Sequence, residues 1–96
     1  MENGAWHLSV ERLVRFDSEG NLKAYADLTI ENLFVIKGLR VVQGKNGLFV
    51  SMPRQQGKDG KWYDTVTTLT KETKEEVGRV VLSAYEQDAT RLQGAT

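Results

Sequence analysis

The run from Gly44 to Pro53 constrains the fold of this chain more than any other stretch. Asn46-Gly47 predicts a tight hairpin turn, because both residues accept positive φ at little steric cost. The next three residues, Leu48-Phe49-Val50, have the apolar, aromatic and β-branched character of a buried strand. Pro53 cannot donate to a sheet ladder, so this strand should reach an edge or leave the sheet there. Together with the strand-like segment 34–42, the run predicts a hairpin with an apolar centre.

Two further strands are predicted before this hairpin. The segment 22–30 alternates strictly, with apolar side chains at Leu22, Ala24, Ala26, Leu28 and Ile30 and mostly polar residues between them. In the segment 8–16, the period of two places Leu8, Val10, Val14 and Phe16 on one face, interrupted by Arg12, and Leu13 on the other. Turns are expected at 17–20 and at Glu31-Asn32.

The sequence after Pro53 predicts a loop, a short strand and a helix. Residues 54–61 are polar and contain a second turn pair, Asp59-Gly60, and the segment 62–66 reads as a short strand. The helix should begin near Thr70 or Thr73, where Thr73-Lys74-Glu75-Glu76 fits a capping box. An apolar stripe at helical spacing follows: Val77, Val80, Val81, Ala84 and Tyr85. Gly78 lies within this helix and weakens it by about 1 kcal/mol relative to alanine.

These elements predict an α+β fold: a twisted antiparallel β-sheet of four to five strands, with the C-terminal α-helix packed on one face. This arrangement buries every apolar stripe. No repeat or linker interrupts the 96 residues, so we expect a single domain with a core over about 8–87 and frayed ends, although Trp6 is a candidate for docking on the domain.

Composition narrows the class of protein. The chain contains no cysteine, which excludes disulfides and thiol chemistry. No apolar run approaches the roughly 20 residues of a membrane helix, and the N-terminus has no signal-peptide pattern. A soluble cytoplasmic protein is therefore expected.

Formal charge is balanced, with 13 basic and 13 acidic residues, but it is unevenly distributed. Residues 1–36 carry a net charge of −3 and residues 62–96 a net charge of −2, whereas residues 37–61 carry +5. The balance argues against a protein that coats nucleic acid indiscriminately. The positive charge is instead concentrated around the central hairpin.

Catalytic and metal-binding patterns are weak. His7 is the only histidine and has no evident partner, Glu75 and Glu76 point in different directions on the helix, and Gly44-x-x-Gly47 lacks the Lys-Ser/Thr of a phosphate loop. No metal-ligand spacing is recognisable. We therefore predict that the protein is not an enzyme and has no cofactor, metal or small-molecule substrate.

A binding role rests on cations interleaved with aromatic residues. The candidate nucleic-acid-binding residues are Arg40, Lys45, Arg54, Lys58 and Lys61, with Trp62 and Tyr63 beside the last of them. Cations of this kind grip phosphates, and aromatic rings stack on bases. From the residues alone, solvated loop charges that protect exposed edges are the more frequent explanation of such a pattern.

The chain resembles the SpoVG septation-regulator family of bacteria over about residues 8–87. The segments that carry the resemblance are 34–36, 39–42, 44–53, Asp59-Gly60, Asp64 and 81–85. The resemblance implies a small homodimer that binds DNA or RNA and regulates gene expression linked to septation and sporulation. It associates DNA binding with the C-terminal helix region of the family. The chain departs from the family at three places. Family members commonly carry a Lys-Arg pair just after the Met-Pro, where this chain has Gln55-Gln56. They commonly carry an Arg before the aspartate that matches Asp64, where this chain has Tyr63, and a His-Pro ahead of the helix, where it has Thr67-Thr68.

Two questions remain open at this level. The segments 48–52 and 62–66 each offer a strand edge to a second copy, and the sequence does not choose between them. The alternative function is a structural or protein-interaction module that acts through a partner without binding nucleic acid. The zero net charge and the acidic residues on the outer face of the helix, Glu75 and Glu86 around Arg79, favour it.

Overall fold

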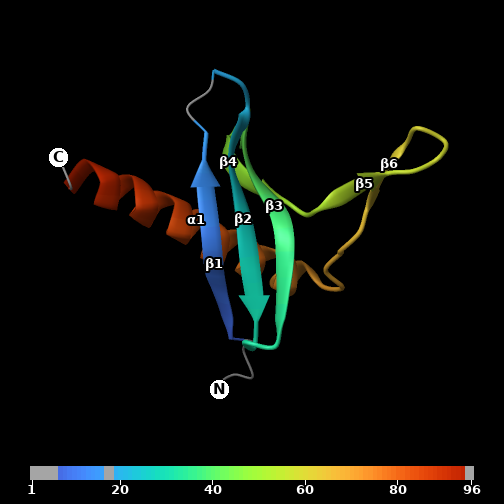
Figure 1. The fold of residues 1–96 in the computed structure, drawn as a ribbon, viewed down its shortest axis with the longest axis horizontal. Coiled ribbons are helices and arrows are strands. Elements are labelled where there is room, and N and C mark those ends of the chain that lie inside the picture. Colours follow the sequence, from blue (N-terminus) through green and yellow to red (C-terminus); the bar gives the residue numbers. More distant parts are fainter. Residues whose placement is uncertain (1–6, 17–18, 95–96) are drawn as a thin grey trace.

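The computed structural model describes residues 7–16 and 19–94, the last six of these by their backbone alone. The elements, in chain order, are β1 (Leu8–Arg15), β2 (Leu22–Ile30), β3 (Phe34–Gly44), β4 (Gly47–Ser51), β5 (Arg54–Gln56), β6 (Trp62–Asp64) and α1 (Lys71–Gly94). Strands β1-β2-β3-β4 form an antiparallel sheet in that order, and β5 and β6 form a separate pair. Helix α1 crosses one face of the four-stranded sheet, and the β5–β6 pair projects beside it (Figure 1). The α+β fold predicted from the sequence is confirmed.

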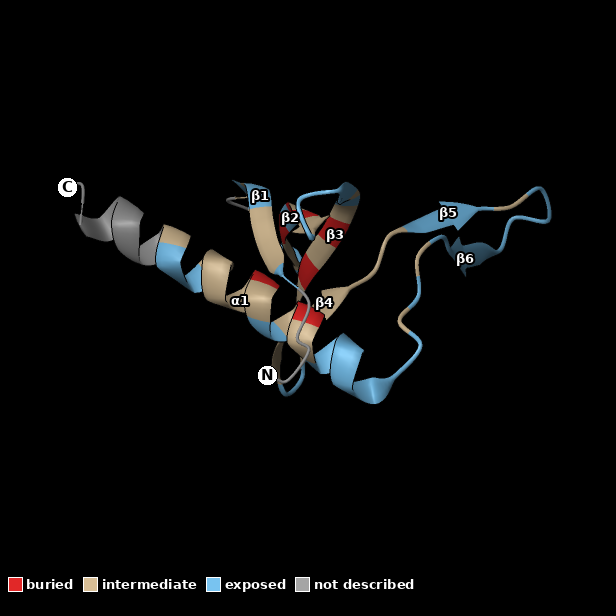
Figure 2. Cartoon of the chain, turned by 90° about the horizontal axis from the view of Figure 1, so that it is seen from below, coloured by how far each residue is buried: buried red, intermediate tan, exposed pale blue. Residues whose placement is uncertain are grey.

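The core lies between the sheet and α1. Strand β2 supplies its centre, because its alternation turns Ala24, Ala26 and Leu28 towards the helix, where all three are buried. The other buried side chains come from β3 and α1 and are Leu39, Val41, Val77 and Val81. Figure 2 places these buried segments where the helix meets the strands. The helix stripe is confirmed, and the strand face is confirmed from Ala24 to Leu28; Leu22 lies beyond a register shift between Leu22 and Ala24 and is not part of the core cluster.

Strand β1 differs from its prediction because it contains a β-bulge. The register with β2 shifts between Val10 and Arg12, so the extra residue, Glu11, has no partner on β2. One extra residue reverses the alternation that follows it. Leu13 consequently packs on the core, and Val14 lies on the opposite face with 37% of its surface exposed. The prediction that Val14 shares a face with Leu8 and Val10 was wrong.

Two predicted turns lie where the sequence placed them, one with a shift, and the turn predicted at 17–20 falls partly outside the described residues. Glu31 and Asn32 have φ values of 54° and 55° and join β2 to β3. In the β3–β4 hairpin, Gly44 pairs with Gly47, so the two-residue loop is Lys45-Asn46 and not Asn46-Gly47. Asn46 does not adopt positive φ; Gly47 does, at 123°, a conformation that side chains rarely allow. Strand β4 ends at Ser51, before Pro53, as predicted.

Helix α1 begins after Thr70, the earlier of the two predicted starts. The Thr70 hydroxyl accepts a hydrogen bond from the backbone N–H of Thr73 at 3.1 Å, which makes Thr70 the N-cap. The capping box predicted at Thr73 is not formed, because Glu76 binds Arg79 instead. Val77 and Val81 are buried, and Val80 and Tyr85 pack against the core from its margin. The suggestion that Trp6 docks on the domain lies outside the described residues.

Candidate nucleic-acid interface

The β5–β6 hairpin, residues 54–64, forms an arm that stands away from the core. Pro53 and Met52 lead into it, and on the return the backbone N–H and the hydroxyl of Thr65 both donate to the Pro53 carbonyl, at 3.0 and 3.2 Å. All six residues of the two short strands are exposed. Figure 2 shows the arm on the same side of α1 as the sheet. The side chains of the arm are therefore exposed to solvent, and two hydrogen bonds at its base hold it to the domain.

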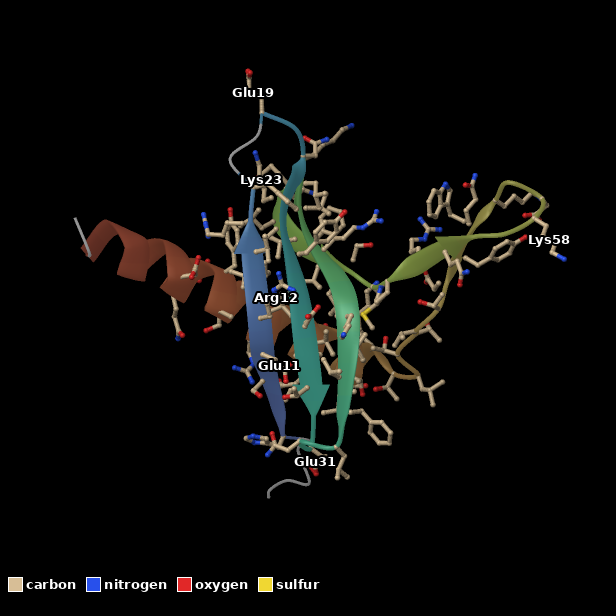
Figure 3. The ribbon with its side chains drawn as sticks, viewed as in Figure 1. Glu11, Arg12, Glu19, Lys23, Glu31 and Lys58 are labelled. Carbon is tan, nitrogen blue, oxygen red and sulfur yellow. The ribbon has the colours of Figure 1, made fainter. Side chains whose placement is uncertain are left out.

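The tip of the arm is held by backbone hydrogen bonds and carries two lysines. Gly57 donates its N–H to the Lys61 carbonyl and accepts from Gly60 N–H, at 2.8 and 3.0 Å. A Cβ on Gly57 would lie 2.9 Å from the Tyr63 ring, so this close approach requires glycine. Lys58 lies at the tip and extends away from the domain (Figure 3). Lys58 and Lys61 make no ion pair with any described residue, so both charges are open to an anionic partner.

Aromatic rings accompany these lysines. Trp62 and Tyr63 are each 51% exposed, on neighbouring positions of β6. The Tyr63 hydroxyl donates a short hydrogen bond to the Asp59 carboxylate, which also accepts the Lys61 backbone N–H at 3.0 Å. The bond from Tyr63 and then that from Lys61 lower the pKa of Asp59, and the bond to Asp59 raises the pKa of Tyr63. Asp59 thus serves the internal structure of the arm.

Arg54 is less available than the two lysines. Its Nε lies 3.1 Å from the Asp64 carboxylate, its cross-strand partner, and its Nη2 donates to the Trp62 carbonyl at 3.4 Å. The Asp64 charge offsets that of Arg54, and both side chains remain about half exposed. Arg54 therefore stabilises the pairing of β5 with β6 as well as contributing to the surface.

The structure divides the five predicted site residues among three places. Arg54, Lys58 and Lys61 share the arm. Lys45 is exposed in the β3–β4 turn, at the end of the sheet remote from Glu31. Arg40 lies on β3, on the sheet face turned away from α1, with its guanidinium carbon 5.9 Å from the centre of the Tyr25 ring. The basic segment of the sequence is thus an arm, a turn and a sheet position, not one cluster.

The outer face of α1 is largely neutralised by pairs along the helix. Arg79 Nε donates to Glu76 at 3.1 Å, and Lys71 Nζ lies 4.0 Å from Glu75. The bond to Arg79 lowers the pKa of Glu76 and raises that of Arg79. Arg79 is therefore offset by Glu76 and not, as the sequence suggested, by Glu75.

Sequence reasoning did not single out two other surfaces. One is an apolar groove between the start of α1 and the sheet, bordered by Leu8, Ile36, Met52, Val66, Leu69 and Val77. Leu69 is 94% exposed on its rim. The other is the sheet face away from α1, where Tyr25 and Phe49 are exposed. The alternation of β2 already placed Tyr25 on that face; the groove depends on tertiary packing and has no local signal.

Within the described ranges, 7–16 and 19–94, no three His, Asp or Glu side chains come close enough to hold a metal ion. Helix α1 is not apolar enough to cross a membrane over its described length. The described residues thus define a small α+β domain that presents a basic hairpin and an open sheet face.

Comparisons with known proteins place this domain. The SpoVG family matches residues 9–87, more than three quarters of the chain, and the chain belongs to that family. It is 40% identical over 76 residues to the "Putative septation protein SpoVG" of Archaeoglobus fulgidus, a match that covers 79% of this chain and 89% of the relative. It is 36% identical over 76 residues to the protein of the same name from Clostridium perfringens, covering 79% and 84%. The resemblance drawn from the sequence is confirmed.

Proposed function

We propose that this protein is a regulator that acts by binding nucleic acid, and that it is not an enzyme. The observation that supports this proposal is the arm. Lys58 extends from its tip (Figure 3), and neither Lys58 nor Lys61 has an acidic partner among the described residues. The same hairpin carries two half-exposed aromatic rings. Ammonium groups on a projecting hairpin reach phosphates without moving the core. The septation role named for the relatives, and cytoplasmic action on DNA or RNA, are part of the same proposal.

The experiment is a pair of salt titrations of binding to duplex DNA. Each phosphate contact contributes about 0.9 to the slope of the logarithm of the affinity against the logarithm of salt concentration. Replacement of Lys58 and Lys61 with glutamine should flatten the slope by about 2 and weaken binding to all sequences alike. Arg54→Gln should have a smaller effect on the slope, because Asp64 already offsets that charge.

Arg79→Gln is the matched control. It removes one positive charge from the helix face, where Glu76 already neutralises it. Its slope should stay close to that of the parent. A lysine double variant that binds like the parent, beside an Arg79→Gln variant that does not bind, would move the footprint to the helix and overturn this proposal.

The proposed active form is a homodimer. Its support is the apolar groove, because an exposed rim residue such as Leu69 and a lining of aliphatic side chains favour burial against a second surface. A second copy that covers the groove leaves both arms available. Two arms on one particle raise affinity through effective concentration when both engage the same nucleic acid.

The groove also favours the second candidate function, a protein-interaction module without nucleic-acid binding. In that case the groove would receive an apolar segment of another protein. A pull-down that is insensitive to nuclease, together with no measurable binding to any nucleic acid at low salt, would establish this alternative and exclude the first.

A further inference from the structure

We infer that the sheet face turned away from α1 is a stacking platform for the unpaired bases of single-stranded nucleic acid. We call it the open face; its register positions include Arg12, Val14, Tyr25, Arg40, Val42 and Phe49. This inference rests on the proposed function and adds the class of ligand, single strands rather than duplex.

Two aromatic rings are exposed on the open face at the spacing of alternate strands. Tyr25 lies on β2 with 37% of its surface exposed, and Phe49 lies on β4 with 49% exposed. Strand β3 runs between them, and Phe49 pairs with Val42, two residues beyond the Arg40 that pairs with Tyr25. The two positions are therefore about 12 Å apart, offset both across and along the sheet. Phe16 and Tyr25 make a T-shaped contact, with ring centres 5.0 Å apart at 86°, and this packing braces the Tyr25 ring. A braced, partly exposed ring is pre-organised for stacking.

Cations lie between and beside the rings. Arg40 pairs in register with Tyr25 on one side and with Ser51 on the other, and its guanidinium approaches the Tyr25 ring. Arg12 lies on the edge strand β1, about midway along it in Figure 3, and pairs in register with Asp27 on the same face. Arginine can both stack on a base and pair with a phosphate. Arg40, on the strand between the two rings, is therefore placed to contact the phosphate that links two stacked bases.

The acidic content of the open face is small. Among its described register-paired positions the acid is Asp27, and its carboxylate accepts the N–H of Gly38 at the β3 bulge, at 3.3 Å. Glu11 lies at the β1 bulge, on the edge strand. The charge of the platform therefore complements a polyanion.

A second copy of the chain is a poorer occupant of this face than a nucleic acid. An isologous two-fold contact would bring the arginines of both copies to one interface, where like charges oppose association. A duplex is also a poor fit, because its bases are stacked on each other and have no free face for Tyr25 or Phe49. The arm stands on the same side of α1 as the sheet, so its lysines can hold a strand whose bases lie on the open face (Figure 2).

The test compares binding of short oligouridylate, oligothymidylate and a duplex of the same length, about 12 residues, by fluorescence anisotropy. The parent should bind either single strand more tightly than the duplex. Tyr25→Leu with Phe49→Leu keeps apolar bulk and removes both rings, and should weaken single-strand binding by about fivefold or more per ring with the salt slope unchanged. Comparison of oligouridylate with oligothymidylate distinguishes RNA from DNA as the ligand.

Phe34→Leu is the matched control, since Phe34 is an exposed aromatic residue at the end of β3, outside the open face. It should bind like the parent. The platform is overturned if the protein with Tyr25→Leu and Phe49→Leu is folded and binds single strands like the parent. In that case, loss of binding on replacement of Lys58 and Lys61 with glutamine would still support the arm as a binding site. A parent that binds no nucleic acid overturns the platform and the proposed function together.

Discussion

The Arg15 guanidinium lies 3.9 Å from the centre of the Tyr85 ring and joins β1 to the middle of α1. The same side chain donates from Nη1 to the Tyr85 carbonyl at 3.0 Å, and its Nε lies 3.9 Å from Asp88. Because Arg15 pairs in register with buried Ala24, it closes the end of the core that the aliphatic residues do not reach. One cation thus makes three contacts between β1 and α1.

Arg15→Met should therefore destabilise the domain by about 1–2 kcal/mol, because it keeps the apolar stem and removes the cation–π contact and the charged hydrogen bond. Urea unfolding measures the change. Lys37→Met is the control: Lys37 is exposed and its side chain has no partner among the described residues, so its replacement should change stability by less than about 0.5 kcal/mol. Equal effects of the two substitutions would contradict the role assigned to Arg15.

Gly78→Ala should stabilise the protein. Gly78 lies inside α1, and a Cβ at this position would meet no atom within 4 Å. Alanine should then gain the helix-propensity difference of about 1 kcal/mol without steric cost. In a domain of this size the gain corresponds to a rise in Tm of roughly 4–8 °C. Thermal unfolding followed by circular dichroism checks it, and an unchanged or lower Tm would show that the glycine is required by a contact.

The order of the arm should depend on pH through Asp59 and Tyr63. The pKa of Asp59 is lowered below its usual 3.8. The carboxylate therefore stabilises the arm fully above that value, and this stabilisation is lost as the pH falls through the lowered pKa. The pKa of Tyr63 is raised above its usual 10.0. The protonated hydroxyl therefore stabilises the arm fully below that value, and this stabilisation is lost as the pH rises through the raised pKa. The arm should accordingly be most ordered between these limits.

The readout is the amide resonance of Lys61, whose N–H binds Asp59. It should be constant between about pH 4 and pH 10 and shift only below and above that window, as the lowered pKa of Asp59 and the raised pKa of Tyr63 require. In Asp59→Asn the acid-side shift should disappear, because the amide does not titrate. An acid-side transition that persists unchanged in Asp59→Asn would assign it to another carboxylate.

Leu69→Lys should disrupt the proposed dimer. Leu69 is 94% exposed, so the substitution costs the single chain little, whereas a buried ammonium in an apolar interface is strongly unfavourable. Sedimentation at micromolar concentration should show a dimer for the parent and a monomer for the variant. Lys37→Met serves again as a control and should remain dimeric. A parent that sediments only as a monomer refutes the dimer.

The sequence predicted those parts of the fold that local patterns decide. The alternation from Ala24 to Leu28 and the helical stripe from Val77 to Tyr85 each identify their buried face. At the start of β2 the local pattern fails, because the register with β3 shifts between Leu22 and Ala24. The phase of β1 was not predictable in this way. A bulge at Glu11 reverses the alternation, and its position is set by pairing with β2, which is distant in sequence.

The candidate site was predictable as a composition but not as a geometry. The lysines and aromatic residues of the arm were identified from the segment 54–63, whereas the pairing of Arg54 with Asp64 depends on the register of two strands that form their own sheet. Two threonines three residues apart, Thr70 and Thr73, offered equal capping chemistry, and the path of the chain out of the arm selected Thr70. The Arg54–Asp64 pairing and the position of the N-cap depend on tertiary structure, so a local sequence pattern cannot predict them.

The separation of the arm from the sheet has a consequence for how this protein can diversify. The buried core cluster of the described chain contains no residue of the segment 54–64. Substitutions at its exposed positions, such as Gln55, are therefore expected to alter what the surface contacts while the folded domain keeps its stability. Selection can then tune ligand preference and foldedness on different residues, and homologues with one shared scaffold can acquire distinct targets.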